Sequence, residues 1–265
     1  WTYRHDIGRQ DVEAHFGDQV ETFFVESVSE GPDAERVINA MVLQGADIIF
    51  TTSFGYMEAT LKMANRYPHV KFEHATGYKQ AKNMSSYGLR LYQARHVQGI
   101  IAGMMTKSAA KVLMAQGCDM VAQHTDSPAP MQAAEQQGKF GFGQASDQIA
   151  FAPEAQLTAT IDNWSPYYIR KVQAVIDGNW ESENYFGHMN EDVVQMAPFT
   201  NMPNGVRAIA QKVKDAISNG EYFAFTGPIK DQAGEIRIQA NEVATDGELN
   251  SMNYYVEGIT ARFPD

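Results

Sequence analysis

Apolar residues recur with a helical period in two stretches of the chain that resemble each other. Residues 34–54 read AERVINAMVLQGADIIFTTSF, and residues 109–127 read AAKVLMAQGCDMVAQHTDS. The segments VKFEHATGY, from Val70, and GKFGFGQASD, from Gly138, also match each other. Each copy reads as a helix, a glycine stop, a short apolar strand, a small polar turn, a second helix and another strand. The pattern therefore predicts a β-α-β unit that occurs twice.

One such unit cannot cover both faces of its own strands. Two copies predict an α/β fold with either one long parallel sheet or two similar lobes, each with helices on both faces. Ligands bind at the carboxyl ends of the strands in such sheets. The turns TTSFG (51–55) and HTDSPAP (124–130) follow strands of the two copies, so we expect the functional site there.

The rest of the chain continues this alternation in part. We expect helices over 2–16, 92–105, 166–178 and 206–218, and strands over 20–28, 84–91 and 156–164. Residues 180–205 read as irregular. Residues 222–229, 235–244 and 252–260 alternate in a way that suits a small antiparallel arrangement.

The alternation breaks at two places. No strand precedes the first helix, so Trp1 reads as the end of a strand-to-helix turn. The helix over 92–105 leads through TKS directly into the helix that begins at Ala109, although parallel strands need a crossover between them. We therefore expect that a first strand, and a segment near 108–109, are missing.

Composition narrows the classes of function. The formal net charge of the 265 residues is −11, and the 21 Lys and Arg form no basic stripe, which argues against a nucleic-acid partner. No apolar run approaches the length that spans a membrane. The lone Cys118 is expected to be a small buried hydrophobe without a disulfide.

Aromatic residues accompany the polar turns at the predicted strand ends. Phe54 follows Thr52 and Ser53, Trp164 follows Asp162 and Asn163, and Trp1 occupies a similar turn. An aromatic ring at the mouth of a sheet offers a flat face to a planar ligand, and stacking a base on one is worth about 1 to 3 kcal/mol. Ser127 and Ser165 precede prolines and are better explained as helix caps.

Two carboxylates complete the candidate site. Asp126 and Asp147 each follow a strand of the second half, and an ionised carboxylate accepts hydrogen bonds from sugar hydroxyls or from the N–H groups of a base. A helix cap or a surface carboxylate is the equally weighted alternative for each. His124 and Asp126 flank Thr125 without a nucleophile motif, and His74 and His124 lack a third ligand, so the sequence favours neither catalysis nor a metal.

At this point the motifs resemble a known family. IIFTTSFGYMEATLKMANRYPHVKFEHATGYK, VAQHTDSPAPMQAAE, FGQASDQ, DNWSPYYIRKVQAVIDG and FTGPIKDQAG together resemble the BMP (basic membrane protein, PnrA-like) substrate-binding proteins of ABC transporters. The resemblance implies a type I periplasmic-binding-protein fold, with two αβα lobes, three crossings and a ligand enclosed between them. The lobes would comprise 1–90 plus 163–190, and 91–162 plus 191–265.

The resemblance also implies a function. It predicts a periplasmic receptor, neither enzyme nor cofactor-dependent, that binds a purine nucleoside or nucleobase and delivers it to membrane permease subunits. The implied ligand residues are Trp1, Ser53, Phe54, Asp126, Asp147 and Trp164. The family's GPVGDGGW-like opening is represented only by Trp1, so one expected ligand Asp is absent, as are the family's residues between TKS and AAK. A sugar-binding or sensory protein of the same fold and a nucleosidase-type enzyme are the alternatives.

Overall fold

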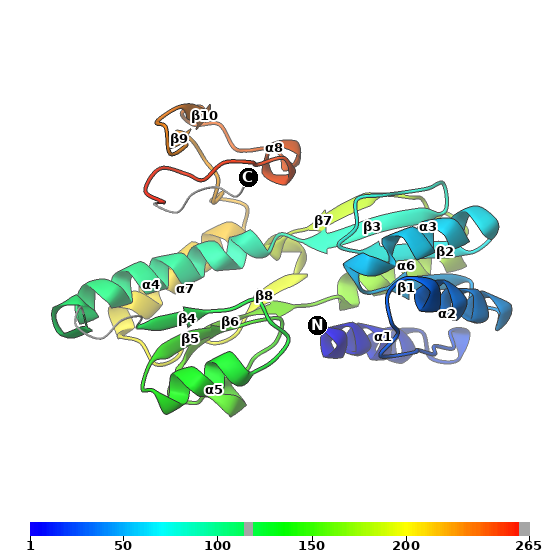
Figure 1. The fold of residues 1–265 in the computed structure, drawn as a ribbon, viewed down its shortest axis with the longest axis horizontal. Helices are drawn as coiled ribbons and strands as arrows, with labels where there is room; N and C mark the ends of the chain where they lie inside the picture. Colours follow the sequence, from blue (N-terminus) through cyan, green and yellow to red (C-terminus); the bar gives the residue numbers. More distant parts are fainter. Residues whose placement is uncertain (114–118, 260–265) are drawn as a thin grey trace.

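The chain folds into two α/β bodies that lie side by side, with a small C-terminal unit above them (Figure 1). The computed structural model describes residues 1–113 and 119–259, and the side chains of these residues except 106–113. The N-terminus lies where the two bodies meet (Figure 1). Cys118, which was expected to be a small buried hydrophobe, lies outside the described residues.

The first body is built on a parallel sheet. Its strands are β1 (Ile48–Thr51), β2 (Lys71–Ala75), β3 (Met84–Leu89) and β7 (Asn184–Gly187), in the order β1-β2-β3-β7. One face packs against α2 (Pro32–Leu43) and α3 (Met57–Arg66), and the other against α1 (Thr2–Phe16) and α6 (Ser165–Ile176). Parallel strands require this cover on both faces.

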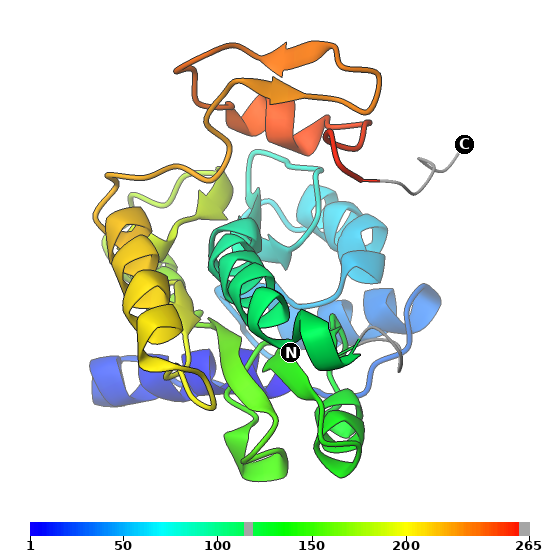
Figure 2. The same cartoon turned by 90° about the vertical axis from the view of Figure 1, so that its left-hand side faces the viewer.

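The second body repeats the design with one change. Its strands are β4 (Met120–Ala122), β5 (Phe140–Gly143), β6 (Gln156–Asp162) and β8 (Val194–Met196), and β8 runs antiparallel to β6. The helices α4 (Leu91–Leu113) and α7 (Asn204–Ser218) lie side by side on one face, as Figure 2 shows, and α5 (Ala129–Gln136) covers the other.

The chain passes between the two bodies three times, from β3 to α4, from β6 to α6 and from β7 to β8. The α/β fold class with parallel sheets, predicted from the repeat, is confirmed. Of the two arrangements that the repeat left open, the structure has two bodies.

Three expected elements differ in the structure. Residues 20–28 form no strand, since no backbone hydrogen bond joins them to a strand among the described residues. Residues 180–205 are less irregular than expected, since they contain β7 and β8. In the C-terminal unit, β9 (Ile229–Lys230) and β10 (Ile236–Ile238) pair antiparallel and α8 (Asp246–Asn250) follows, but residues 252–259 contribute only a single bridge at Val256.

The two helices expected on either side of 108–109 form one continuous helix, α4. Helical spacing on both sides of TKS explains this continuity, because no residue there interrupts the helical backbone.

A buried ion pair joins α6 to β2 inside the first body. Lys171 Nζ lies 3.0 Å from Glu73 Oε1, and both side chains are almost fully buried. Tyr167 and Trp180 also donate hydrogen bonds to the Glu73 carboxylate, at 2.5 and 2.7 Å. Burial raises the pKa of Glu73, while the Lys171 charge opposes that shift. These donors satisfy a carboxylate that would otherwise be costly to bury.

Candidate functional site

A cavity of about 330 Å³ lies between the two bodies, at the carboxyl ends of their parallel strands. Its residues follow β1 and β2 in the first body and β4 and β5 in the second, apart from Trp1, which precedes α1. The lining residues are Trp1, Ser53, Phe54, Thr76, His124, Thr125, Asp126, Gln144 and Ala145. The volume is at the lower end of the range of small-molecule sites.

Trp1 is held in place by contacts on several sides. Its indole Nε1 donates to the carbonyl oxygen of Thr52 at 2.5 Å, just beyond the end of β1. Its ring packs edge-on against His5, with ring centroids 4.6 Å apart, and against Trp164, at 5.5 Å. Trp1 therefore presents an ordered aromatic surface to the cavity.

Trp164 lies beneath Trp1 instead of in the cavity wall. It is buried, and its ring stacks on His5 with centroids 4.7 Å apart. His5 in turn shares a 2.6 Å hydrogen bond with Tyr168, and burial lowers the pKa of His5 to about 3, so its imidazole is neutral. In this conformation Trp164 supports Trp1.

Ser53 and Phe54 form the wall that follows β1. The Ser53 hydroxyl donates to Glu30 Oε1 at 2.8 Å, which orients the turn. The Phe54 ring is 55% exposed and packs against Tyr78, with centroids 6.3 Å apart. Phe54 thus offers open aromatic surface to the cavity.

The opposite wall is arranged by a helix. Arg95 of α4 reaches Gln144 Oε1 with one guanidinium nitrogen, at 2.9 Å, and the same nitrogen lies 2.7 Å from His124 Nδ1. Because Arg95 can only donate, His124 must accept at Nδ1, which places its proton on Nε2. Asp126 is 73% exposed at the rim, and its Oδ1 lies 3.5 Å from the Trp1 nitrogen across the junction.

Asp162 is a buried carboxylate beside this wall. It is fully buried at the end of β6, where its backbone N–H donates to the carbonyl oxygen of Ala145 at 2.9 Å. Neither carboxylate oxygen has a hydrogen-bond partner among the residues that the structure describes. Burial raises the pKa of Asp162 to about 7, and the charges of Arg4 and Arg95 oppose this. A buried, unsatisfied acceptor is a feature of functional sites.

Two turns at the cavity adopt strained backbone. Thr76 has φ of 64° and Ala145 has φ of 63°, a left-handed conformation that residues other than glycine rarely adopt. Both residues line the cavity, one from each body. Strain of this kind clusters at ligand sites, where the surrounding structure enforces it.

The remaining predicted residues lie outside the cavity lining. Asp147 Oδ1 accepts hydrogen bonds from the Ile149 nitrogen at 3.0 Å and from Gln156 Nε2 at 2.6 Å, within the second body. The Ser127 hydroxyl accepts from the Ala129 nitrogen at 3.1 Å, but Pro128 is the residue that precedes α5, so Ser127 is not the N-cap that was expected. Ser165 is not a cap, since its hydroxyl donates to Asp11 at 2.5 Å and it is the first residue of α6.

The structure thus brings Trp1, Ser53, Phe54 and Asp126 together around one cavity. Sequence reasoning missed Thr76 and Gln144, although both follow strands whose carboxyl ends it had placed at the site. The sequence around Arg95 did not indicate a role in the site, because only the packing of α4 against the second sheet brings Arg95 next to Gln144.

The arrangement is suited to binding. Aromatic faces from the first body, and carboxylate, amide and imidazole groups from the second, can enclose a planar ligand that carries hydrogen-bond donors. Among the described residues, no group of three or more His, Cys, Asp or Glu side chains could hold a metal ion.

Two α/β bodies that face each other across a cavity at their strand ends define a two-lobed ligand-binding protein. The chain matches the family described as "ABC transporter substrate-binding protein PnrA-like" over residues 1–115 and 106–225, and it belongs to this family. Such proteins deliver ligands to permease components, are not enzymes and are typically extracytoplasmic. None of the helices in the described part of the chain is long and apolar enough to cross a membrane.

Two sequence relatives cover the whole chain. A purine-binding protein of Brucella abortus (strain 2308), BAB2_0673, is 44% identical over 314 residues, covering 100% of this chain and 90% of its own length. A Haloferax volcanii protein named "Putative ABC transporter glucose-binding protein TsgA13" is 28% identical over 315 residues, covering 100% of this chain and 78% of its own length.

Solved structures share the fold. A transcriptional activator of the comK gene from Bacillus halodurans has a TM-score of 0.70 at 19% identity, over 84% of this chain and 95% of its own. An ABC transporter solute-binding protein from Conexibacter woesei has a TM-score of 0.61 at 14% identity, over 82% and 92%. The predicted periplasmic-binding-protein-like fold is therefore confirmed.

The comparisons also bear on the expected missing segment. The alignments with the two sequence relatives extend over 314 and 315 residues, more than the 265 residues of this chain. The family model matches in two pieces that overlap at residues 106–115. Both findings agree with a segment missing near 108–109, in the carboxyl-terminal third of the continuous helix α4.

Proposed function

We propose that this protein captures a purine nucleoside or purine nucleobase between its lobes and delivers it to the permease subunits of an ABC importer, outside the cytoplasm. The observation that carries the proposal is the cavity whose walls come from the strand ends of both bodies, with Trp1 and Phe54 at its aromatic side. The 44% identity to a purine-binding protein supports the ligand class.

The lobes of this proposal are 1–90 plus 163–190, and 91–162 plus 191–265. Each connection between them is short, so the lobes can rotate about the three connections as a hinge. A ligand that contacts both walls favours the closed arrangement, and the permease distinguishes closed from open by the changed surface.

In this proposal the purine ring lies against Trp1 or Phe54. Asp126 at the rim accepts hydrogen bonds from ribose hydroxyls or from ring N–H groups. Asp162 is buried behind the residues that line the cavity, so it accepts from a ligand N–H only if the lobes move to expose it. Gln144, held through its Oε1 by Arg95, retains its amide N–H groups for ring nitrogens. Ligand contact by Asp147 stays a prediction, and it requires this carboxylate to exchange its present hydrogen bonds for the ligand.

The test is calorimetric titration with adenosine, adenine, guanosine and ribose, followed by chromatography of the ligands. We expect stoichiometric binding of at least one purine compound with the ligand recovered intact. Binding with release of ribose from adenosine would instead establish a nucleosidase, which is the enzymatic alternative.

A sugar is the second candidate ligand, because one relative carries the name of a glucose-binding protein. Exposed aromatic rings and acidic groups also bind sugars, through the apolar faces and the hydroxyls of the ring. Saturable binding of ribose or glucose, without binding of any purine compound, would favour this reading.

A further inference from the structure

The polar side chains around the cavity between the lobes differ in what they offer a ligand. Ser53 and Thr76 line the cavity from the first body, and both have already used their hydroxyl hydrogens. Ser53 donates to Glu30 Oε1 at 2.8 Å, and Thr76 donates to the carbonyl oxygen of Ala75 at 2.7 Å. Carboxylate and carbonyl oxygens can only accept, so each hydroxyl has only its lone pairs left for a ligand. The first wall therefore accepts hydrogen bonds.

Three more lining residues have no free side-chain donor. Thr125 donates its hydroxyl hydrogen to Gln123 Oε1 at 2.7 Å, and the ionised carboxylate of Asp126 can only accept. The indole Nε1 of Trp1 donates to the carbonyl oxygen of Thr52 at 2.5 Å. Free side-chain donors at this cavity must therefore come from other lining residues.

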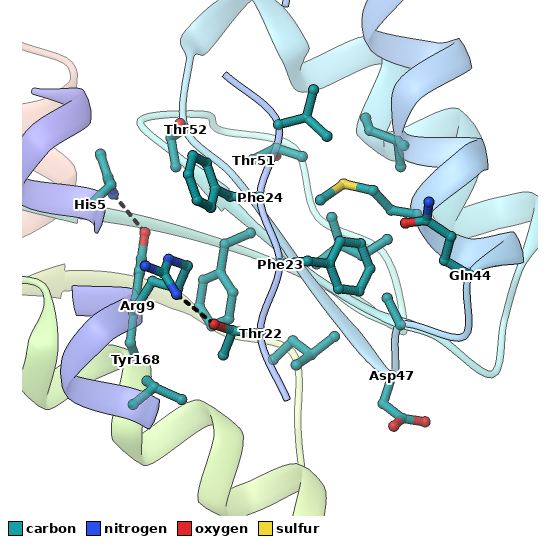
Figure 3. A pocket seen from close by; sticks show the side chains of 18 of the residues that line it. His5, Arg9, Thr22, Phe23, Phe24, Gln44, Asp47, Thr51, Thr52 and Tyr168 are labelled. Atoms are coloured by element: carbon teal, nitrogen blue, oxygen red, sulfur yellow. Dashed lines mark hydrogen bonds between the residues drawn. The ribbon is translucent and has the colours of Figure 1, made fainter. Parts of the chain in front are cut away.

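Four polar side chains deeper in the first body supply no donor to this cavity either. They lie around a separate cavity of about 840 Å³ beside β1. There the Nδ1 atom of His5 and the hydroxyl of Tyr168 share a hydrogen bond of 2.6 Å, and Arg9 Nη1 donates to Thr22 Oγ1 at 2.7 Å (Figure 3). None of these four residues lines the cavity between the lobes.

His124 and Gln144 are the remaining polar side chains of the lining, and both belong to the second wall. One guanidinium nitrogen of Arg95 lies 2.7 Å from His124 Nδ1 and 2.9 Å from Gln144 Oε1. No partner for His124 Nε2 or for Gln144 Nε2 is found among the residues that the structure describes. These two nitrogen atoms are therefore the donors that a ligand meets.

Arg95 decides that both groups donate. A guanidinium group has no acceptor, so the atoms that face it must accept. The proton of the neutral His124 ring is then on Nε2, and the NH₂ group of the Gln144 amide points away from Arg95. Without Arg95, either ring nitrogen of His124 could carry the proton, and the Gln144 amide could turn over.

We propose that Arg95 is a positioning residue that makes His124 and Gln144 a pair of donors, and that this pair binds acceptor atoms of the ligand, at least one of them an unprotonated ring nitrogen. Purines carry such nitrogens at N3 and N7. The N–H and hydroxyl groups of the ligand then lie toward the accepting side chains. The inference rests on the proposed function and specifies which edge of the purine faces the second lobe.

The first test needs no ligand. Nitrogen-15 NMR at about pH 8, above the usual range in which histidine titrates, reports which ring nitrogen carries the proton. The signal that is lost in His124→Gln identifies His124. We expect its proton on Nε2 in the unaltered protein, and an added Nδ1–H form in Arg95→Met. A proton on Nδ1 in the unaltered protein, or no change in Arg95→Met, would overturn the proposal.

The second test is calorimetric titration with the purine compound that binds and with its 1-deaza, 3-deaza and 7-deaza counterparts, in which C–H replaces one ring nitrogen. At least one counterpart should bind about tenfold more weakly or worse, because it leaves a donor of the wall unpaired. Gln144→Glu should weaken the parent compound to a similar extent, since the new carboxylate accepts from Arg95 but cannot donate to the ligand. Gln132→Glu adds the same charge at an exposed position of α5 and should leave Kd unchanged.

The ratio of Kd between the deaza and parent compounds separates positioning from a general loss of stability. In Arg95→Met this ratio should shrink to less than about threefold, because the donors are no longer held toward the ligand. Equal affinities for all the compounds in the unaltered protein, an unchanged ratio in Arg95→Met, or an unchanged Kd in Gln144→Glu would overturn the proposal and leave purine capture intact. Binding of no purine compound at all would instead contradict the proposed function, and this inference with it.

Discussion

Phe54 is the residue whose replacement tests the ligand site most simply. Its ring is exposed in the cavity, so removing it should weaken purine binding with little effect on stability. Since stacking a base is worth about 1 to 3 kcal/mol, Phe54→Ala should raise Kd about 5- to 150-fold. Phe151→Ala is the matched control, because Phe151 is similarly exposed but lies outside the cavity lining. Equal effects of both variants in calorimetry would remove Phe54 from the site.

Asp162 makes stability depend on pH. Burial raises its pKa to about 7, whereas the unfolded chain has a value near 4, so folding takes up a proton between these values. The protonated Asp162 contributes fully to the free energy of unfolding below about pH 4. As the pH rises from 4 to 7 this contribution is lost, and the free energy of unfolding falls by an amount on the order of 4 kcal/mol.

In the Asp162→Asn variant, the free energy of unfolding should therefore fall less between pH 4 and pH 7 than it does in the unchanged protein. Denaturant unfolding at a series of pH values measures this. It should also weaken binding of a ligand that donates to the ionised carboxylate. An unchanged pH profile together with unchanged affinity would show that Asp162 has neither role.

At the scale of the residue, the sequence predicted much of one wall and less of the other. Trp1, Ser53, Phe54 and Asp126 line the cavity because each lies in a turn at the strand-end edge, and that rule is local. That rule could not predict Arg95 or Asp162. Their importance comes from packing, which brings a helix side chain to Gln144 and shields a strand-end carboxylate from water.

At the scale of the element, a buried ion pair joins α6 to β2 in the first lobe. Lys171→Met would leave Glu73 buried without its counter-charge, although Tyr167 and Trp180 still donate to it. We expect a loss of about 3 to 5 kcal/mol in unfolding free energy at pH 7. The exposed Lys212 on α7 provides the control substitution, Lys212→Met. A loss below about 1 kcal/mol for Lys171→Met would mean that the pair contributes little.

Elements of the repeat were predictable because their patterns are local. Each copy carries its own helical period, glycine stop and apolar strand, and β1, β2, β4 and β5 form as expected. Residues 20–28 show the limit, since a strand-like pattern pairs only when a neighbouring strand is present. The short strands β7 and β8 were missed for the converse reason, because the neighbours β3 and β6 define them more than their own sequence does.

At the scale of the whole molecule, ligand binding should draw the lobes together. The cavity walls come from both lobes, so a ligand that touches both stabilises the closed form. Small-angle X-ray scattering should show a smaller radius of gyration when the purine compound that binds in calorimetry is present in excess. The Phe54→Ala protein should show this change only at higher ligand concentration. An unchanged radius at saturation would argue against hinge closure.

Topology at this scale was predictable, since two copies of a β-α-β unit allow few arrangements. The repeat alone did not predict whether the strands form one sheet or two. That choice depends on the connections from β3 to α4, from β6 to α6 and from β7 to β8, which carry the chain between the bodies.

The measurement that tests the central claim most directly is a crystal structure of the protein grown with adenosine and adenine in separate experiments. We expect the purine between the lobes, with its ring against Trp1 or Phe54 and with hydrogen bonds to groups from both walls. A purine that contacts a single lobe would contradict the account.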